Sequence, residues 1–156
     1  MTNRTDQIDE DDRKILREVQ VDTTRSLERI ATKIGMSKTT LWNRLQRMIQ
    51  NGVVLRQAAI LSPKKVGLME TFFVSVRTSQ HDSGWLDDFR KVVDDMPEIT
   101  EAHRLAGTLD YLLKVQVEST EAFDAFYKTL VSRISIYEVS SSLSMEEMKR
   151  TLALKV

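Results

Sequence analysis

The sequence contains no cysteine and only two histidines among its 156 residues. The absence of cysteine excludes disulfide bonds, a thiol nucleophile and thiolate metal ligands. Two histidines, His81 and His103, are too few for a histidine-rich metal centre, so no metal site is expected. No apolar run approaches the roughly 18 residues of a membrane span, and the first residues lack the apolar stretch of a signal peptide. We therefore expect a cytoplasmic protein without a membrane partner.

The charge is balanced over the whole chain but unevenly distributed along it. The sequence has 23 basic and 23 acidic residues, and its 41% apolar content is typical of a globular protein. Residues 25–65 hold nine basic residues and one acidic residue, a net charge of +8, between flanks of net −3 and −5. Such a block indicates a local anion-binding surface. The alternative interpretation is a solvated helix face.

Residues 1–54 are predicted to form three short helices. Asp9, Ser26 and Ser37 are suitable N-caps, and apolar residues follow each of them at helical spacing. Gly35 supplies the left-handed conformation that a tight turn between the second and third helices requires. The expected buried stripes are Ile15, Leu16 and Val19, then Leu27, Ile30, Ala31 and Ile34, then Leu41, Leu45, Met48 and Ile49. A supporting helix followed by two helices around a short turn is the helix-turn-helix motif.

The outer face of the third helix carries residue types that contact phosphates and base edges. Residues near its N-terminus are expected to point at bases in the major groove. Arg44 and Arg47, one turn further on, either donate to phosphates or pack against the first helix. Trp42 is interpreted as a partly buried anchor in preference to a base-stacking group. The predicted DNA-binding residues are Arg25, Ser37, Lys38, Thr39, Thr40, Asn43, Arg44 and Arg47.

The rest of the chain favours an α+β domain. Residues 55–68 are a β-prone linker that ends in a Ser-Pro-Lys-Lys-Val-Gly signal. Residues 69–156 alternate in period, and this alternation predicts the order β-α-β-β-α-β of a ferredoxin-like sheet with both helices on one face. The expected class is therefore an N-terminal, winged-helix-like helix-turn-helix domain followed by a ferredoxin-like domain. The other sheet face offers Phe73, Leu112 and Ala102, so pairing with another subunit is expected.

Several segments together resemble one known family. The matching stretches are Ile8–Leu16, Ile30–Ser37, Leu41–Met48, Asn51–Val54, Leu61–Gly67 and Gly107–Leu113. In their order and spacing these stretches resemble the Lrp/AsnC (leucine-responsive, or feast/famine) transcriptional regulators over nearly the whole chain. The segments Met96–Glu98, Asp110–Val115 and Ser141–Glu146 look most similar to the subgroup that contains a cysteine-responsive detoxification regulator.

The resemblance implies an N-terminal helix-turn-helix joined to an amino-acid-sensing domain. It implies homodimers that pair through their C-terminal sheets and assemble into tetramers or octamers, bound to the nucleoid of a bacterium or an archaeon. It also implies an effector pocket between dimers and no cofactor besides a small amino acid. Thr108 stands where the family often has an acidic residue, and Leu109 where it often has an aromatic one. The effector-binding residues carried over are Gly107, Thr108, Asp110, Ser140 and Ser142.

An amino-acid ligand brings a carboxylate and an ammonium group that these residues can satisfy. Backbone amides near Gly107 can meet the carboxylate, and Asp110 can accept from the ammonium group. The hydroxyls of Ser140 and Ser142 can serve either group. The competing interpretation of the Gly-x-x-Asp loop is an ordinary hairpin turn. His103 is expected at the surface or at an interface, and His81 in a loop.

The sequence thus predicts a sequence-specific DNA-binding regulator whose assembly or DNA affinity responds to a small amino acid. The alternative is an effector-independent architectural protein that compacts DNA. An enzyme is disfavoured, because no nucleophile elbow, phosphate loop or metal cluster is present and no catalytic residue is assigned.

Overall fold

The computed structural model describes residues 8–79 and 83–156. By their contacts these residues form two compact units, each with its own core. One unit comprises the chain up to Ala59 together with Lys149–Val156, and the other comprises Ile60–Met148. The expected boundaries placed residues 149–156 in the C-terminal domain, whereas their contacts are with the N-terminal unit. His81 lies outside the described residues.

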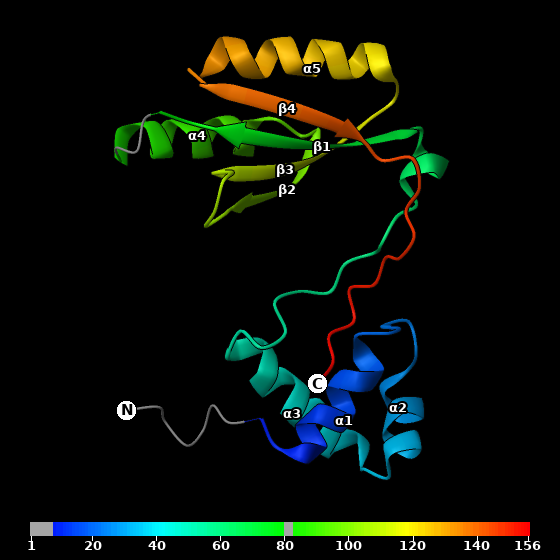
Figure 1. The fold of residues 1–156 in the computed structure, drawn as a ribbon. Helices are drawn as coiled ribbons and strands as arrows, with labels where there is room; N and C mark the ends of the chain where they lie inside the picture. The colour runs from blue at the N-terminus through cyan, green and yellow to red at the C-terminus, as the bar shows by residue number, and fades with distance from the viewer. Residues whose placement is uncertain (1–7, 80–82) are drawn as a thin grey trace. The chain divides into compact units, whose positions relative to one another are not determined.

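The N-terminal unit contains three helices, each of which begins after its predicted cap. They are α1 (Glu10–Val19), α2 (Leu27–Ile34) and α3 (Lys38–Gln50) (Figure 1). The side chains of Asp9, Ser26 and Ser37 accept hydrogen bonds from backbone N–H groups three residues further on. Gly35 ends α2 with φ at 69°, in the left-handed region, so the chain turns directly into α3. The predicted helix-turn-helix is confirmed.

The core of the N-terminal unit follows the predicted stripes with one exception. Its buried residues are Ile15, Leu16, Val19, Ile30, Ala31, Leu41, Leu45 and Met48. Ile49 is 36% exposed, so its assignment to the core was wrong. At 100° per residue, Ile49 lies about 80° around α3 from Leu41, beyond the edge of the buried stripe.

The described part of the N-terminal unit contains no strand, so the expected winged-helix character is not seen. The β-prone residues after α3 are extended and largely exposed up to a 3₁₀ helix, η1 (Pro63–Val66). A strand needs a neighbour to receive its backbone hydrogen bonds, and this segment pairs with no other described part of the chain. Among the described residues, no helix is both long and apolar enough to cross a membrane.

The C-terminal unit has the predicted ferredoxin-like order. Its elements are β1 (Glu70–Arg77), α4 (Ser83–Asp95), β2 (Ile99–Arg104), β3 (Tyr111–Val117), α5 (Thr120–Arg133) and β4 (Glu138–Leu143). The strands lie in the spatial order β2-β3-β1-β4, and all neighbours are antiparallel. Strands β1 and β3 are therefore central, and β2 and β4 form the two edges.

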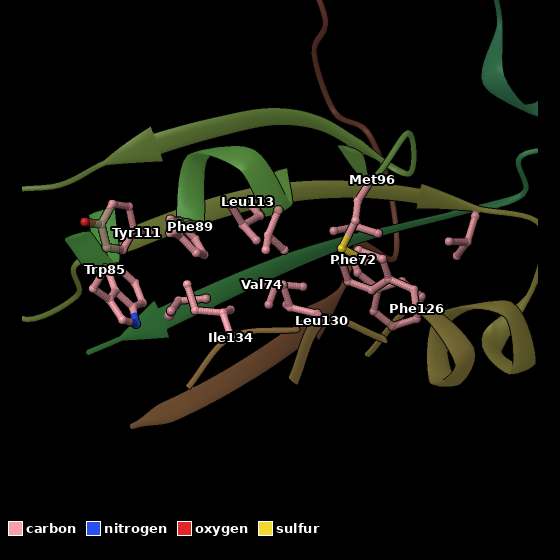
Figure 2. Close-up of a cluster of buried hydrophobic side chains, with 14 residues drawn as sticks. Phe72, Val74, Trp85, Phe89, Met96, Tyr111, Leu113, Phe126, Leu130 and Ile134 are labelled. Carbon is pink, nitrogen blue, oxygen red and sulfur yellow. The ribbon is translucent and has the colours of Figure 1, made fainter. Parts of the chain in front are cut away.

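Both helices cover the same face of this sheet. Alternate residues of β1 and β3, such as Val74 and Leu113, point into a core against Phe89 of α4 and Leu130 of α5 (Figure 2). Trp85 and Tyr111 close one end of this core, with ring centroids 5.7 Å apart. The opposite face carries the other set of alternate side chains and is not covered by any described element.

One residue expected on the open face lies on the covered face instead. Phe73 and Leu112 are on the open face, as predicted, but Ala102 pairs with the buried Leu113 and so points toward the helices. The register of β2 shifts between Ile99 and Glu101. Such an irregularity reverses the side on which each later residue of the strand lies, which explains the wrong assignment.

Candidate DNA-binding helix and ligand-binding face

The outer face of α3 presents polar side chains to solvent. Lys38, Thr39 and Asn43 are exposed, and none of them makes a side-chain hydrogen bond or ion pair with a described residue. All three lie in the N-terminal half of the helix, the part of a recognition helix that reaches base edges. Their donors and acceptors are therefore available to a ligand.

Two other predicted residues hold the first turn of α3. The hydroxyl of Ser37 accepts from the N–H of Thr40 at 3.1 Å, and the two hydroxyl oxygens are 2.8 Å apart. This capping fixes where the helix begins. The exposed Lys38 and Thr39 therefore project from a well-anchored helix end.

Arg44 and Arg47 pack against α1. One guanidinium nitrogen of Arg44 donates to both carboxylate oxygens of Asp9, at 2.9 and 2.7 Å, and to Asp12 at 2.9 Å. Arg47 donates to the other oxygen of Asp12, which is only 1% exposed. Of the two interpretations of these arginines, the structure has the packed one. The i, i+3 spacing puts the two acids on one side of α1 and the two arginines on one side of α3, but it does not predict that these two sides meet.

The cluster shifts the titration of its exposed acid. The hydrogen bond from Arg44, followed by that from the backbone N–H of Asp12, lowers the pKa of Asp9 from 3.8 to about 2. The same contacts raise the pKa of Arg44 above its ordinary value. Both groups therefore remain charged at neutral pH, and the ion pairs between α1 and α3 persist.

Arg25 joins α1 to the start of α2. Its guanidinium donates to the carboxylate of Glu18 at 2.7 Å and to the backbone oxygen of the same residue at 3.0 Å. Lys33 also reaches Glu18, and the hydrogen bonds from Lys33 and then Arg25 lower the pKa of that carboxyl. Arg25, like Arg44 and Arg47, thus holds the three helices together within the unit.

Trp42 is less buried than an anchor should be. Its side chain is 49% exposed, and it stands one helical turn after Lys38. Because helical side chains lean toward the N-terminus, we expect the ring over the turn that carries Lys38. Half of an indole surface is therefore presented beside the polar residues of the same helix end.

The two predicted effector serines lie on the open face of the sheet. Ser140 pairs with Ser75 and Ser142 pairs with Phe73, and both serines are exposed on the edge strand β4. Salt bridges flank them on this face, at 2.7 Å between Arg77 and Glu138 and at 2.9 Å between Lys114 and Glu101. The hydrogen bond from Lys114 lowers the pKa of Glu101.

The loop between β2 and β3 lies at the end of the sheet where β4 begins. Val76 pairs with both Tyr111 and Val139, which places Asp110 and Ser140 near the same end of the sheet, on either side of β1. Oδ2 of Asp110 accepts the backbone N–H of Thr78 at 2.8 Å, so this carboxylate anchors the loop. A Cβ placed on Gly107 would meet no atom of a described residue within 4 Å, so the loop has open space beside it.

Comparison with known proteins decides what these two units are. Residues 8–49 match the AsnC-type helix-turn-helix domain, and residues 71–154 match the Lrp/AsnC ligand-binding domain. The chain belongs to the Lrp/AsnC family. It is therefore a DNA-binding transcriptional regulator with an N-terminal helix-turn-helix and a ligand-binding domain, as the resemblance implied, and not an enzyme.

Relatives of known role cover almost the whole chain. The glutamate uptake regulatory protein of Zymomonas mobilis is 41% identical over 147 residues, which is 94% of this chain and 90% of the relative. The DNA-binding transcriptional activator DecR of Escherichia coli is 39% identical over 150 residues, 96% of this chain and 99% of the relative.

Solved structures of the family share the fold. An AsnC family transcriptional regulator from Agrobacterium tumefaciens is 43% identical with a TM-score of 0.88, covering 99% of this chain and 97% of that one. A transcriptional regulator from Neisseria meningitidis, solved in complex with L-methionine, is 28% identical with a TM-score of 0.86 and the same coverage.

Proposed function

We propose that this regulator reads DNA with the N-terminal half of α3 and that a small amino acid changes its assembly or its DNA affinity. The observation that carries the first part is that α3 exposes Lys38, Thr39 and Asn43 while its other cationic residues are bound within the unit. Because DNA is its target, we place its site of action at the nucleoid, in the cytoplasm of a bacterium or archaeon.

The predicted DNA-binding residues divide into three groups with different roles. Lys38, Thr39 and Asn43 contact base edges or phosphates directly. Ser37 and Thr40 fix the helix end that faces the groove. Arg25, Arg44 and Arg47 hold α1 and α2 against α3. If they also contact DNA phosphates, they do so while they remain in these ion pairs.

The proposed DNA contacts of α3 are tested with a duplex that the wild-type protein selects from a random-sequence pool. Affinity is then measured against salt concentration for wild type, Lys38→Ala and Asn43→Ala. Loss of one phosphate contact at Lys38 should lower the salt slope by about 1, and loss of a base contact at Asn43 should reduce discrimination against mismatched sites. Lys128→Ala, on the exposed face of α5, is the matched control. Curves for Lys38→Ala and Asn43→Ala that coincide with wild type would reject the assignment of α3 to the groove.

We propose the open end of the ligand-binding sheet as the effector site, formed by Gly107, Thr108, Asp110, Ser140 and Ser142. One oxygen of Asp110 is used by Thr78, and the other receives no hydrogen bond from a described residue, so it can accept from an ammonium group. The names of two relatives, a glutamate uptake regulator and a methionine complex, support an amino acid as the ligand class.

Asp110→Asn tests ligand binding by Asp110 without removing the hydrogen bond by which this residue anchors the loop. The amide oxygen still accepts the N–H of Thr78, but the negative charge that attracts an ammonium group is gone. We expect one of twenty amino acids at millimolar concentration to raise the melting temperature of the wild type, and Asp110→Asn to abolish that rise. A retained rise would move the pocket elsewhere. No rise with any amino acid would favour the effector-independent architectural protein.

We further propose that the open face of the sheet joins two subunits and that dimers assemble into tetramers or octamers. Phe73, which is 40% exposed, and Leu112 are the apolar residues of this face, and Phe73 lies between Lys114 of β3 and Ser142 of β4. Phe73→Glu should convert the assembly toward monomers, as measured by light scattering on a sizing column. An unchanged mass for this variant would place the interface on another surface.

A further inference from the structure

The last residues of the chain return to the DNA-binding unit. Strand β4 ends at Leu143, and residues 144–156 contain no helix or strand. By their contacts, Lys149–Val156 nevertheless belong with the three N-terminal helices (Figure 1). The chain therefore connects its two units twice, once before β1 and once after β4.

The contact with α1 is specific and is made through backbone groups. The side-chain amide of Gln20 donates to the backbone oxygen of Leu154 at 2.8 Å and accepts from the backbone N–H of the same residue, also at 2.8 Å. Nε of Arg17 donates to the backbone oxygen of Val156 at 2.9 Å. The Val156 side chain packs against the core of the N-terminal unit, whereas Leu154 is 73% exposed.

This pattern is that of a docked extended peptide. A single glutamine satisfies both backbone groups of one residue, as a neighbouring strand would, and one partly buried apolar side chain packs against the helical core. Recognition of this kind requires the docked segment to be extended, but it depends little on the identity of its side chains. Few contacts hold a segment that has no secondary structure of its own, so docking is readily reversible.

We propose that the C-terminal end of α1 is a docking surface for residues 149–156, and that this segment is a releasable strap between β4 and the DNA-binding helices. When docked, the strap gives α1 a second attachment to the ligand-binding unit. Because β4 also carries Ser140 and Ser142, a movement of β4 on ligand binding passes along the strap to α1. That last consequence rests on the proposed function, whereas the docking itself does not.

Gln20→Ala tests the docking, with Lys14→Ala as its matched control. Lys14 lies on the same helix, is exposed, and pairs with Asp11 rather than with the strap. In hydrogen exchange on the full chain, the amide of Leu154 should exchange at least fivefold faster in Gln20→Ala and at the wild-type rate in Lys14→Ala. Equal rates in all three proteins would overturn the docking.

The absence of cysteine allows the attachment to be measured with spin labels. Glu28→Cys on α2 and Lys128→Cys on α5 place one label on each unit of the same chain. An excess of unlabelled protein leaves one labelled chain per assembly, so that the distance measured is the one within that chain. The distance distribution should broaden in Gln20→Ala and in a chain truncated after Met148. Distributions of unchanged width in both variants would show that the strap restrains nothing.

A third measurement separates the strap from the effector site. In the truncated chain, the amino acid that stabilises the wild type should still raise the melting temperature, but the change that it causes in DNA affinity should fall toward onefold. If the truncated chain shows the same ligand-induced change in DNA affinity as the wild type, the strap does not transmit a movement of β4 to α1. If no amino acid acts on the wild type, the effector proposal fails, and the exchange and spin-label results still decide the docking.

Discussion

Arg44→Ala distinguishes a structural arginine from a DNA-contacting one. In the structure, Arg44 makes three hydrogen bonds to the carboxylates of Asp9 and Asp12. Asp12 is almost completely buried. Removing Arg44 leaves Asp12 with Arg47 and the N–H of Asp9 as its remaining donors. The variant should therefore lose stability in the N-terminal unit whether or not DNA is present.

The expected loss follows from the burial of the two partners. A hydrogen bond to a charged group contributes about 1.5–3 kcal/mol, and breaking a fully buried pair costs about 3–5 kcal/mol. Arg44 keeps 24% of its side-chain surface exposed and Asp9 keeps 52%, which weakens these interactions through solvent screening. We therefore expect a loss of about 2 kcal/mol. For a unit of this size that corresponds to a fall in melting temperature of roughly 10 °C.

Thermal unfolding followed by Trp42 fluorescence measures this loss in the N-terminal unit. A Trp85→Phe background removes the other tryptophan, which lies in the ligand-binding unit. Lys38→Ala is the matched control, because Lys38 lies on the same helix and pairs with no described residue. Its melting temperature should stay near that of wild type. If Arg44→Ala melts like wild type and instead lowers the salt slope of DNA binding, Arg44 serves a phosphate and our argument fails.

Three further outcomes are expected. The pKa of Asp9 is lowered to about 2, so its ionised form stabilises the fold above pH 4. This contribution to stability is lost as the pH falls from 4 toward 2. Asp9→Asn retains a capping side chain, and its stability should vary less with pH in that range, as measured by acid denaturation. In the Trp85→Phe background, acrylamide should quench Trp42 readily and added duplex should protect it, whereas unchanged quenching would place Trp42 away from the DNA. Leu130→Ala removes a side chain with no exposed surface and should destabilise the ligand-binding unit by about 3 kcal/mol in urea titration, with the N-terminal unit unaffected.

Local patterns in the sequence were sufficient for most of the secondary structure. Caps act within one turn, and apolar residues repeat at the period of the element that they stabilise. Asp9, Ser26 and Ser37 therefore marked three helix starts correctly, and Gly35 marked the turn between α2 and α3. The same reasoning gave the order of strands and helices in the ligand-binding unit, and the order of whole motifs was enough to indicate the family.

The sequence determined the elements, but only the tertiary structure decided which side chains remain free on them. Arg44 meets Asp12 across 32 positions, and Gln20 meets Leu154 across 134, and no local spacing encodes such pairs. A single irregularity in β2 moved Ala102 to the covered face and reversed the side of the later residues of that strand. The surface left for DNA is what remains after these long-range contacts have formed, and their geometry depends on how the elements pack.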